Sequence, residues 1–163
     1  QKMIKKLNLF FLTFCMIGKI KYAPGTFASL ATCILFLLVI NIININVLFL
    51  ITIIIFFYSF VAINNSFDVF DSEDPQEIVI DEVIGQMLPL LAIPIYETLY
   101  PLPTIYYCIL AFVFFRLFDI WKPYPINYVD NNVKGAFGIL FDDIFAAFYS
   151  IIIISLILFF LGG

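Results

Sequence analysis

Long apolar runs alternate with short polar blocks along this chain. Three polar blocks interrupt the pattern, at residues 19–26, 64–82 and 116–143. A membrane-spanning helix needs about 17–25 mostly apolar residues, and residues 27–43 and 47–63 both meet this requirement. Because only residues 44–46 separate these two runs, they predict a helical hairpin.

The second half of the chain predicts three further membrane helices. Residues 83–97 and 104–118 form a weaker hairpin, because both runs are short and Pro89 and Pro94 interrupt the first of them. Because both segments are short, a tilted or re-entrant path stays open for this hairpin. Residues 139–161 form an uninterrupted final span.

The N-terminal apolar run differs from the others in length. Residues 7–17 are too short to cross a bilayer and are expected at the membrane interface. With 64% hydrophobic residues, the chain far exceeds the ~45–50% of soluble proteins. We therefore predict an all-α fold in one domain, residues 1–163: a polytopic membrane helical bundle with about five membrane-embedded helices and an N-terminal interfacial segment.

The distribution of charge orients this predicted bundle. Five crossings place all eight lysine and arginine residues on one side, which the positive-inside rule makes cytoplasmic. Of the twelve acidic residues, only Glu97 falls on the other side. The three polar blocks therefore share one cytoplasmic surface, where they can form a single site.

The first polar block contains a candidate phosphate-binding turn. Thr26 is a candidate helix N-cap and Gly25 permits close approach of the backbone, so the free N–H groups there can hold a phosphate. Simple helix capping explains the same pattern equally well.

The second polar block contains acids of two kinds. Asp74, Pro75 and Glu77 match the N-cap, N1 and N3 positions of a capping box, so Asp74 is either a helix cap or a functional acid. Asp81 and Glu82 would then lie two turns into a helix that enters the bilayer. Acids so near hydrocarbon are functional by default, although a purely interfacial role stays open.

The third polar block combines cations with adjacent acids. Arg116 and Asp119 are three residues apart and can pair along a helix, so Arg116 is either a structural partner or a phosphate ligand. Asp142 and Asp143 are predicted in the first turn of the last span, where acids favour the helix dipole. Two adjacent acids exceed what capping requires. The preceding glycines, Gly135 and Gly138, allow a tight backbone cradle.

Carboxylates and cations that meet at one surface favour metal-assisted phosphate chemistry. Two like charges about 4 Å apart repel by ~4 kcal/mol at an effective dielectric of about 20, and a bridging metal ion removes this cost. All candidate ligands are oxygens and the chain has no histidine, which favours Mg²⁺ over Zn²⁺. Arg116, Lys122 and Lys134 can neutralise the remaining charge of a phosphate.

Other phosphatase mechanisms lack the residues that they require. The chain has no histidine, no Cys-x5-Arg motif, no glycine-rich P-loop and no Asp-x-Asp pair after a strand-like run. For an enzyme, activation of water by carboxylates and a metal ion is the mechanism that remains.

Four stretches of the chain together resemble the phosphatidylglycerophosphatase A family. They are PGTFAS (24–29), DPQEIVIDEVIG (74–85), FRLFDIWKPYPI (115–126) and VKGAFGILFDDIFAA (133–147). The resemblance implies Mg²⁺-dependent removal of the terminal phosphate from phosphatidylglycerophosphate, which yields phosphatidylglycerol, in the bacterial inner membrane. It points to five acids as site residues, namely Asp74, Asp81, Glu82, Asp142 and Asp143. The partners it implies are the lipid substrate and the bilayer, and no nucleic acid.

Two alternatives to this interpretation stay open. The same chemistry can act on another lipid phosphate, such as phosphatidic acid, because headgroup choice depends on the shape of the pocket. The chain can also be a small transporter or channel subunit. Transporters place ionisable groups near the membrane midplane, whereas the acids of this chain are predicted at the cytoplasmic mouth.

Overall fold

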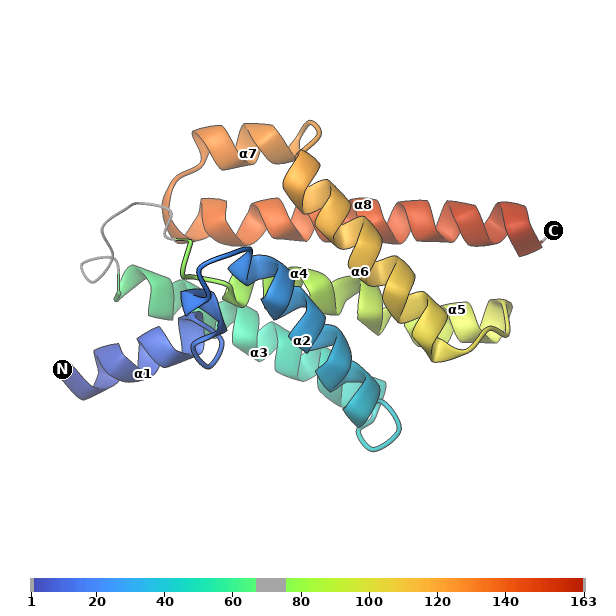
Figure 1. Ribbon diagram of the computed structural model, residues 1–163, viewed down its shortest axis with the longest axis horizontal. Helices are drawn as coiled ribbons and strands as arrows, with labels where there is room; N and C mark the ends of the chain where they lie inside the picture. The colour runs from blue at the N-terminus through green and yellow to red at the C-terminus, as the bar shows by residue number, and fades with distance from the viewer. Residues whose placement is uncertain (1, 67–75, 163) are drawn as a thin grey trace.

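The computed structural model describes residues 2–66 and 76–162 (Figure 1). Every regular element in these two ranges is helical, which confirms the predicted all-α class. The helices are α1 (Lys2–Leu12), a short 3₁₀ helix η1 (Ile17–Lys19), α2 (Pro24–Val39), α3 (Ile45–Asn64), α4 (Ile80–Leu91), α5 (Ile93–Leu99), α6 (Thr104–Trp121), α7 (Ile126–Asn132) and α8 (Gly135–Gly162).

Three of these helices are long and apolar enough to cross a membrane, namely α3, α6 and α8. Helix α2 is apolar but has only 16 residues. The predicted span 83–97 is divided between α4 and α5, which meet at Ala92. Pro94 in the first turn of α5 explains the break, because proline cannot donate the backbone hydrogen bond of a continuous helix. The count of five crossings therefore stays a prediction.

The first helix packs on the last turns of α3. The Tyr58 hydroxyl donates a hydrogen bond to Asn8 Oδ1 at 2.8 Å, and the Tyr58 ring meets Phe11 edge-on, with ring centroids 4.9 Å apart. The outer surface of α1 exposes Met3 and Leu7. This apolar outer face fits the predicted interfacial segment.

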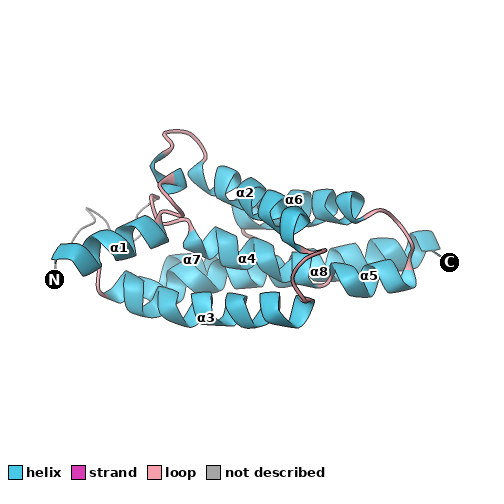
Figure 2. Cartoon of the chain, turned by 90° about the horizontal axis from the view of Figure 1, so that it is seen from below, coloured by secondary structure: helices cyan, strands magenta, loops and turns pink. Residues whose placement is uncertain are grey.

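Helix α4 lies at the centre of the bundle. It packs against α2, α3, α6 and α8, and Figure 2 shows it between α2 and α3. Ile80, Val83 and Ile84 belong to one buried apolar cluster, and Leu90 belongs to a second one further along. Because neighbours surround α4, its first turn is held in a fixed place.

The start of α4 corrects one prediction. The helix begins at Ile80 and residues 76–79 before it are not helical, so α4 does not extend back to Glu77 as predicted; Asp74 and Pro75 of the predicted capping box lie outside the described residues. The Val79 N–H donates to the carbonyl of Leu12 at 3.0 Å instead of entering a helix. Asp81 and Glu82 consequently lie in the first turn of α4, and not two turns inside it.

Two other helix starts also differ from the predictions. Helix α8 begins at Gly135, whose φ of 77° favours glycine, so Asp142 and Asp143 lie about two turns inside it and not in its first turn. Helix α2 begins at Pro24 with Ala23 as its N-cap. Thr26 is therefore inside the helix, and its N–H donates to the Ala23 carbonyl at 3.0 Å.

The chain termini lie at opposite ends of the bundle (Figure 1), as an odd number of crossings requires. The first turns of α2, α4 and α8 and the last turn of α6 meet toward one end, where they line a common cavity. The turn between α5 and α6 lies toward the other end, near the C-terminus. The helices thus gather three separate polar segments at one place.

Candidate active site

A cavity of about 520 Å³ opens where α2, α4, α6 and α8 meet. Eight predicted site residues line it: Gly25, Asp81, Glu82, Arg116, Lys122, Lys134, Asp142 and Asp143. Thr26 is not among the lining residues, and Asp74 falls in the part of the chain that is not described. The predicted convergence of three polar blocks on one site is therefore confirmed for these eight residues.

Three carboxylates form the centre of this cavity. Asp81 and Glu82 of α4 and Asp143 of α8 each offer an oxygen, and these three atoms lie within 4.8 Å of one another. Asp81 Oδ1, Glu82 Oε2 and Asp143 Oδ2 are buried and have no hydrogen-bond partner among the described residues. Burial of unpaired carboxylates is strongly unfavourable, so this carboxylate triad needs either protons or a cation.

The two carboxylates of α4 are poor acids in this environment. Burial, followed by the charge of Glu82, raises the pKa of Asp81 well above its usual range. Burial also raises the pKa of Glu82 to about 7, although a hydrogen bond from protonated Asp81 and the charge of Arg116 act in the opposite direction. A bound divalent cation would replace the protons that these groups otherwise hold.

Arg116 lies beside the triad at the end of α6. Its guanidinium pairs with Asp119, as predicted for residues three apart, and its Nη1 lies 3.9 Å from Glu82 Oε1. The Nε atom is buried and donates no hydrogen bond within the described ranges, whereas Nη1 contacts the carboxylates of Asp119 and Glu82. Arg116 therefore has a structural partner and also keeps its Nε as a donor that an anion can use.

The adjacent acids Asp142 and Asp143 have different surroundings. Lys122 Nζ lies 2.8 Å from Asp142 Oδ2, and Asp142 Oδ1 accepts the Asp143 N–H at 2.9 Å. Both oxygens of Asp142 are thus occupied, whereas Asp143 Oδ2 is not. Asp143 joins the triad, and Asp142 instead holds a cation of the protein.

Lys122 also contacts an acid that sequence reasoning missed. Its Nζ lies 2.6 Å from Asp130 Oδ1 of α7. Burial lowers the pKa of Lys122, but the charges of Asp142 and Asp130 outweigh this effect and raise it above its usual range. The only signal in the sequence was the position of Asp130 in the third polar block, which does not predict that α7 folds back over the site.

Gly25 lets α2 pass close to the side chains of the triad. A Cβ atom on Gly25 would lie 1.8 Å from Glu82 Oε1 and 3.2 Å from Arg116 Nη1, so the predicted close approach at Gly25 is confirmed. The donor predicted at Thr26 is already used within the first turn of α2. Gly138 instead accommodates the backbone of Val133, whose carbonyl oxygen would lie 1.9 Å from an added Cβ.

The carboxylate oxygens of this cavity suit a hard divalent cation, and its guanidinium group suits a phosphate. Three oxygen ligands without partners match the preference of Mg²⁺ for carboxylates and water. The guanidinium of Arg116 lies at the rim of the same group of oxygens, where it can balance the charge of a phosphate. The chain can therefore bring a metal ion, an anion and water together in a cavity that protein walls partly enclose.

Comparisons with known proteins agree with this chemistry. The family model described as Phosphatidylglycerophosphatase A matches residues 10–158. A phosphatidylglycerophosphatase A of Haemophilus influenzae is 34% identical over 137 residues, which cover 84% of this chain and 80% of that protein. One of Escherichia coli is 39% identical over 89 residues, 55% of this chain and 45% of that protein.

A relative with a different name is about as similar. A protein of Bacteroides thetaiotaomicron named "Putative phosphatidylinositol-3-phosphatase" is 33% identical over 137 residues, which cover 82% of each chain. No solved structure matches the chain.

Proposed function

The chain belongs to the phosphatidylglycerophosphatase A family, and we propose that it hydrolyses the terminal phosphomonoester of phosphatidylglycerophosphate to give phosphatidylglycerol. The observation that carries this proposal is the carboxylate triad, with three buried oxygens that lack partners. Arg116 beside the triad supplies the positive charge that a phosphate needs.

Asp81, Glu82 and Asp143 are the residues proposed to hold Mg²⁺. When bound, the ion supplies an activated water and polarises a phosphoryl oxygen. Asp142 was predicted as a fourth ligand, but its contacts support a different role, in which it holds the ammonium group of Lys122 at the wall of the cavity. Asp74 stays a prediction that the described residues do not address.

The cations of the cavity are proposed to bind and orient the substrate phosphate. Arg116 donates from its unused Nε atom to the phosphate oxygens, where negative charge increases in the transition state. Lys122 and Lys134 line the same cavity and neutralise the ground-state charge. The backbone next to Gly25 lets Glu82 and Arg116 stay close together.

The proposed location is the bacterial inner membrane, with the site facing the cytoplasm. Support comes from the positions of the cations, because Arg116, Lys122 and Lys134 line the cavity and the positive-inside rule assigns that side. Glu97, the one acid predicted outside, hydrogen-bonds Thr104 at the other end of the bundle.

A second candidate substrate is a phosphatidylinositol phosphate. The name of the Bacteroides relative favours it, because the two lipid phosphates share a phosphodiester and a phosphomonoester on one polyol. Phosphatidic acid is a third candidate, without a specific observation in its favour. A transport role has little support, because the acids lie toward one end of the bundle.

The test is phosphate release by the purified protein in lipid nanodiscs. The substrates are phosphatidylglycerophosphate, phosphatidylinositol 3-phosphate and phosphatidic acid with identical acyl chains, each assayed with Mg²⁺ and with EDTA. We expect the highest kcat/KM on phosphatidylglycerophosphate with Mg²⁺, and no phosphate release from this lipid in EDTA. Preference for another lipid would overturn the substrate assignment, and equal release in EDTA would overturn the metal assignment.

A further inference from the structure

A second cleft adjoins the catalytic cavity. It has a volume of about 380 Å³ and is lined by residues from η1, from the turn before α2 and from the segment before α4. Two of its lining residues, Pro24 and Gln76, also line the catalytic cavity. A ligand bound in the cleft is therefore adjacent to the catalytic cavity.

The cleft is built by a close contact between two backbone segments. A Cβ atom on Gly18 of η1 would lie 1.9 Å from the Glu77 carbonyl oxygen. The Gly18 N–H is bound to the Thr13 carbonyl at 2.9 Å, which fixes η1 in turn. The lysines on either side of Ile20 are thus held next to the segment that leads into the triad.

Lys19 and Lys21 give this cleft a positive character. Both side chains are exposed, and neither forms an ion pair within the described residues. Lys21 Nζ lies over the Tyr22 ring, 5.5 Å from its centroid. Among the described residues of the lining, Glu77 is the one acid, beside the ammonium groups of Lys19 and Lys21.

The charge of the chain as a whole shows the same asymmetry. Residues 1–66 contain five lysines and no acid, whereas the twelve acids and the other three cations all follow. On the α7 side of the cavity, Lys122 is already paired with Asp130 and Asp142. An additional anion is therefore favoured on the η1 side.

Exposed apolar side chains surround this cleft. Ile20 and Tyr22 are 39% and 73% exposed, and Phe27 on the adjoining turn of α2 is 48% exposed. Lysines next to exposed apolar and tyrosine side chains are typical of the headgroup region of a bilayer. The acyl chains of a lipid can leave the cleft toward the membrane along these residues.

We propose that the Lys19–Lys21 cleft binds the phosphodiester of the lipid substrate while the phosphomonoester lies at the carboxylate triad, an inference that rests on the proposed function. Phosphatidylglycerophosphate carries both groups, joined by a three-carbon glycerol that can extend past Pro24 and Gln76. Phosphatidic acid carries only the phosphomonoester. The cleft therefore selects lipids that have a phosphodiester behind the phosphate to be removed, and it accounts for the names of both classes of relative.

The test compares three lipids on the full-length protein. Phosphatidylglycerophosphate has both groups, phosphatidylglycerol has only the phosphodiester, and phosphatidic acid has only the phosphomonoester. The measurements are KM and kcat for the first lipid and inhibition constants for the other two as competitors. The variants are Lys19→Gln, Lys21→Gln and the double substitution. Lys6→Gln is the matched control, because Lys6 is an exposed lysine of the same N-terminal segment that lines a groove on α1.

We expect the double substitution to raise KM for phosphatidylglycerophosphate and the inhibition constant of phosphatidylglycerol about tenfold each, the loss expected for hydrogen bonds to a charged group. The inhibition constant of phosphatidic acid and kcat should change by less than about twofold, because neither depends on the phosphodiester contact. Lys6→Gln should change none of these values.

Three results would overturn the inference. They are unchanged constants in the double variant, an equal rise for all three lipids, and an equal effect of Lys6→Gln and Lys19→Gln. An equal rise would mean that the lysines act only through the surface potential. Absence of phosphate release by the unsubstituted protein would instead overturn the proposed function, so the two failures are distinct.

Discussion

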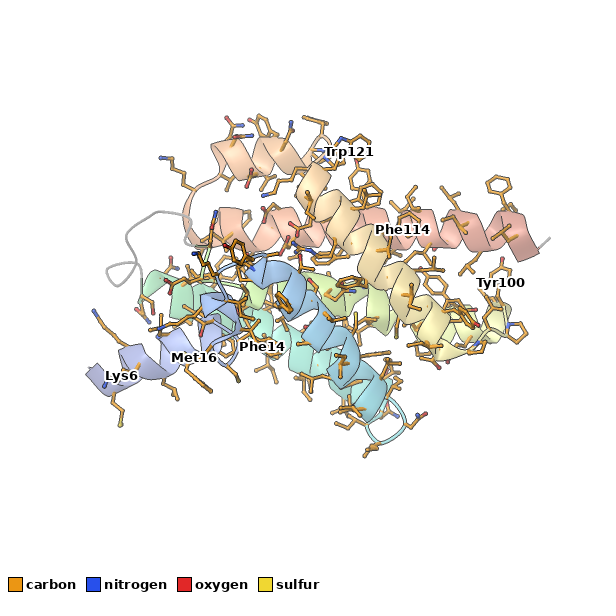
Figure 3. The ribbon with its side chains drawn as sticks, in the orientation of Figure 1. Lys6, Phe14, Met16, Tyr100, Phe114 and Trp121 are labelled. Atoms are coloured by element: carbon orange, nitrogen blue, oxygen red, sulfur yellow. The ribbon has the colours of Figure 1, made fainter. Side chains whose placement is uncertain are left out.

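The two ends of the helical bundle differ in whether their polar groups have hydrogen-bond partners. Near the turn between α5 and α6, the Thr104 hydroxyl donates to Glu97 and the Tyr107 hydroxyl donates to the Tyr100 carbonyl. Figure 3 shows Tyr100 at the end of the molecule that is distant from Lys6. In the candidate active site, oxygens of the triad and the Nε of Arg116 are buried without partners among the described residues.

This contrast separates structural from functional polar residues. A buried polar group without a hydrogen bond is costly, so one that persists indicates a ligand that completes it. The pattern extends one turn beyond Glu82, where both amide atoms of fully buried Gln86 also lack partners among the described residues. Among the described residues, the buried charged side chains with an atom that lacks a hydrogen bond all line the cavity.

The largest effect is expected from neutralising the triad. Asp81→Asn and Asp143→Asn should each lower kcat/KM about a thousandfold or more, because each removes a ligand that binds only when charged. Both variants should remain folded in membranes, since an amide relieves repulsion among buried carboxylates. Phosphate release at limiting Mg²⁺ measures the effect, and near-normal activity would contradict the role of that residue.

A smaller effect is expected from Mg²⁺ on stability. At a concentration one hundred times its dissociation constant, a bound ion adds about 2.7 kcal/mol to the free energy of unfolding. Mg²⁺ should therefore raise the melting temperature of the unsubstituted protein and not that of Asp143→Asn. An equal rise in both proteins would show that the ion acts elsewhere.

Arg116→Lys should lower kcat about thirtyfold and change KM little. The guanidinium can pair with Asp119 through Nη1 and still offer its Nε to an anion, whereas an ammonium group cannot make both contacts in the same geometry. Steady-state kinetics on phosphatidylglycerophosphate provides the measurement. Full activity would reduce Arg116 to a structural ion-pair partner of Asp119.

The convergence of the site was predictable from the sequence, and the helix starts were not. A chain this apolar has few places for its charges, so Asp81, Asp143 and Arg116 had to share the polar end of the bundle. The capping pattern at Asp74 indicated a helix that begins before Ile80. A backbone hydrogen bond to Leu12 prevents it, and no local pattern reveals a partner so distant in sequence.

The different contacts of the adjacent acids Asp142 and Asp143 were also not predictable from the sequence. Asp81 and Glu82 are also adjacent and both join the triad, so adjacency alone does not decide which of Asp142 and Asp143 faces them. Which one does so depends on Lys122, whose position is set by Asp130 of α7. The contact across α7 is tertiary, and the sequence indicated only that both acids lie close to the site.

The pair formed by Asp142 and Lys122 offers a sharper comparison within the site. Lys122→Gln and Asp142→Asn should each raise KM about tenfold and lower kcat less than Asp143→Asn does, because the pair holds a ground-state phosphate contact. Asp130→Asn, which removes only one of the two partners of Lys122, should change KM less. If Asp142→Asn lowers kcat as much as Asp143→Asn does, Asp142 is a metal ligand, as the sequence predicted.

The smallest effect is expected at the opposite end, from Glu97→Gln. The side-chain oxygen of glutamine can still accept the Thr104 hydrogen bond, so the change in unfolding free energy should stay below about 1 kcal/mol. Activity should remain within about twofold, although this substitution removes a negative charge as Asp143→Asn does. Thermal unfolding and phosphate release on the same preparation provide both measurements. Activity that is retained in Glu97→Gln and lost in Asp143→Asn would show that an acid is functional because it lies in the cavity among groups without partners. Its negative charge alone would then not be enough. A large loss in Glu97→Gln would contradict that division, since it would mean that the turn between α5 and α6 controls the distant cavity through α6.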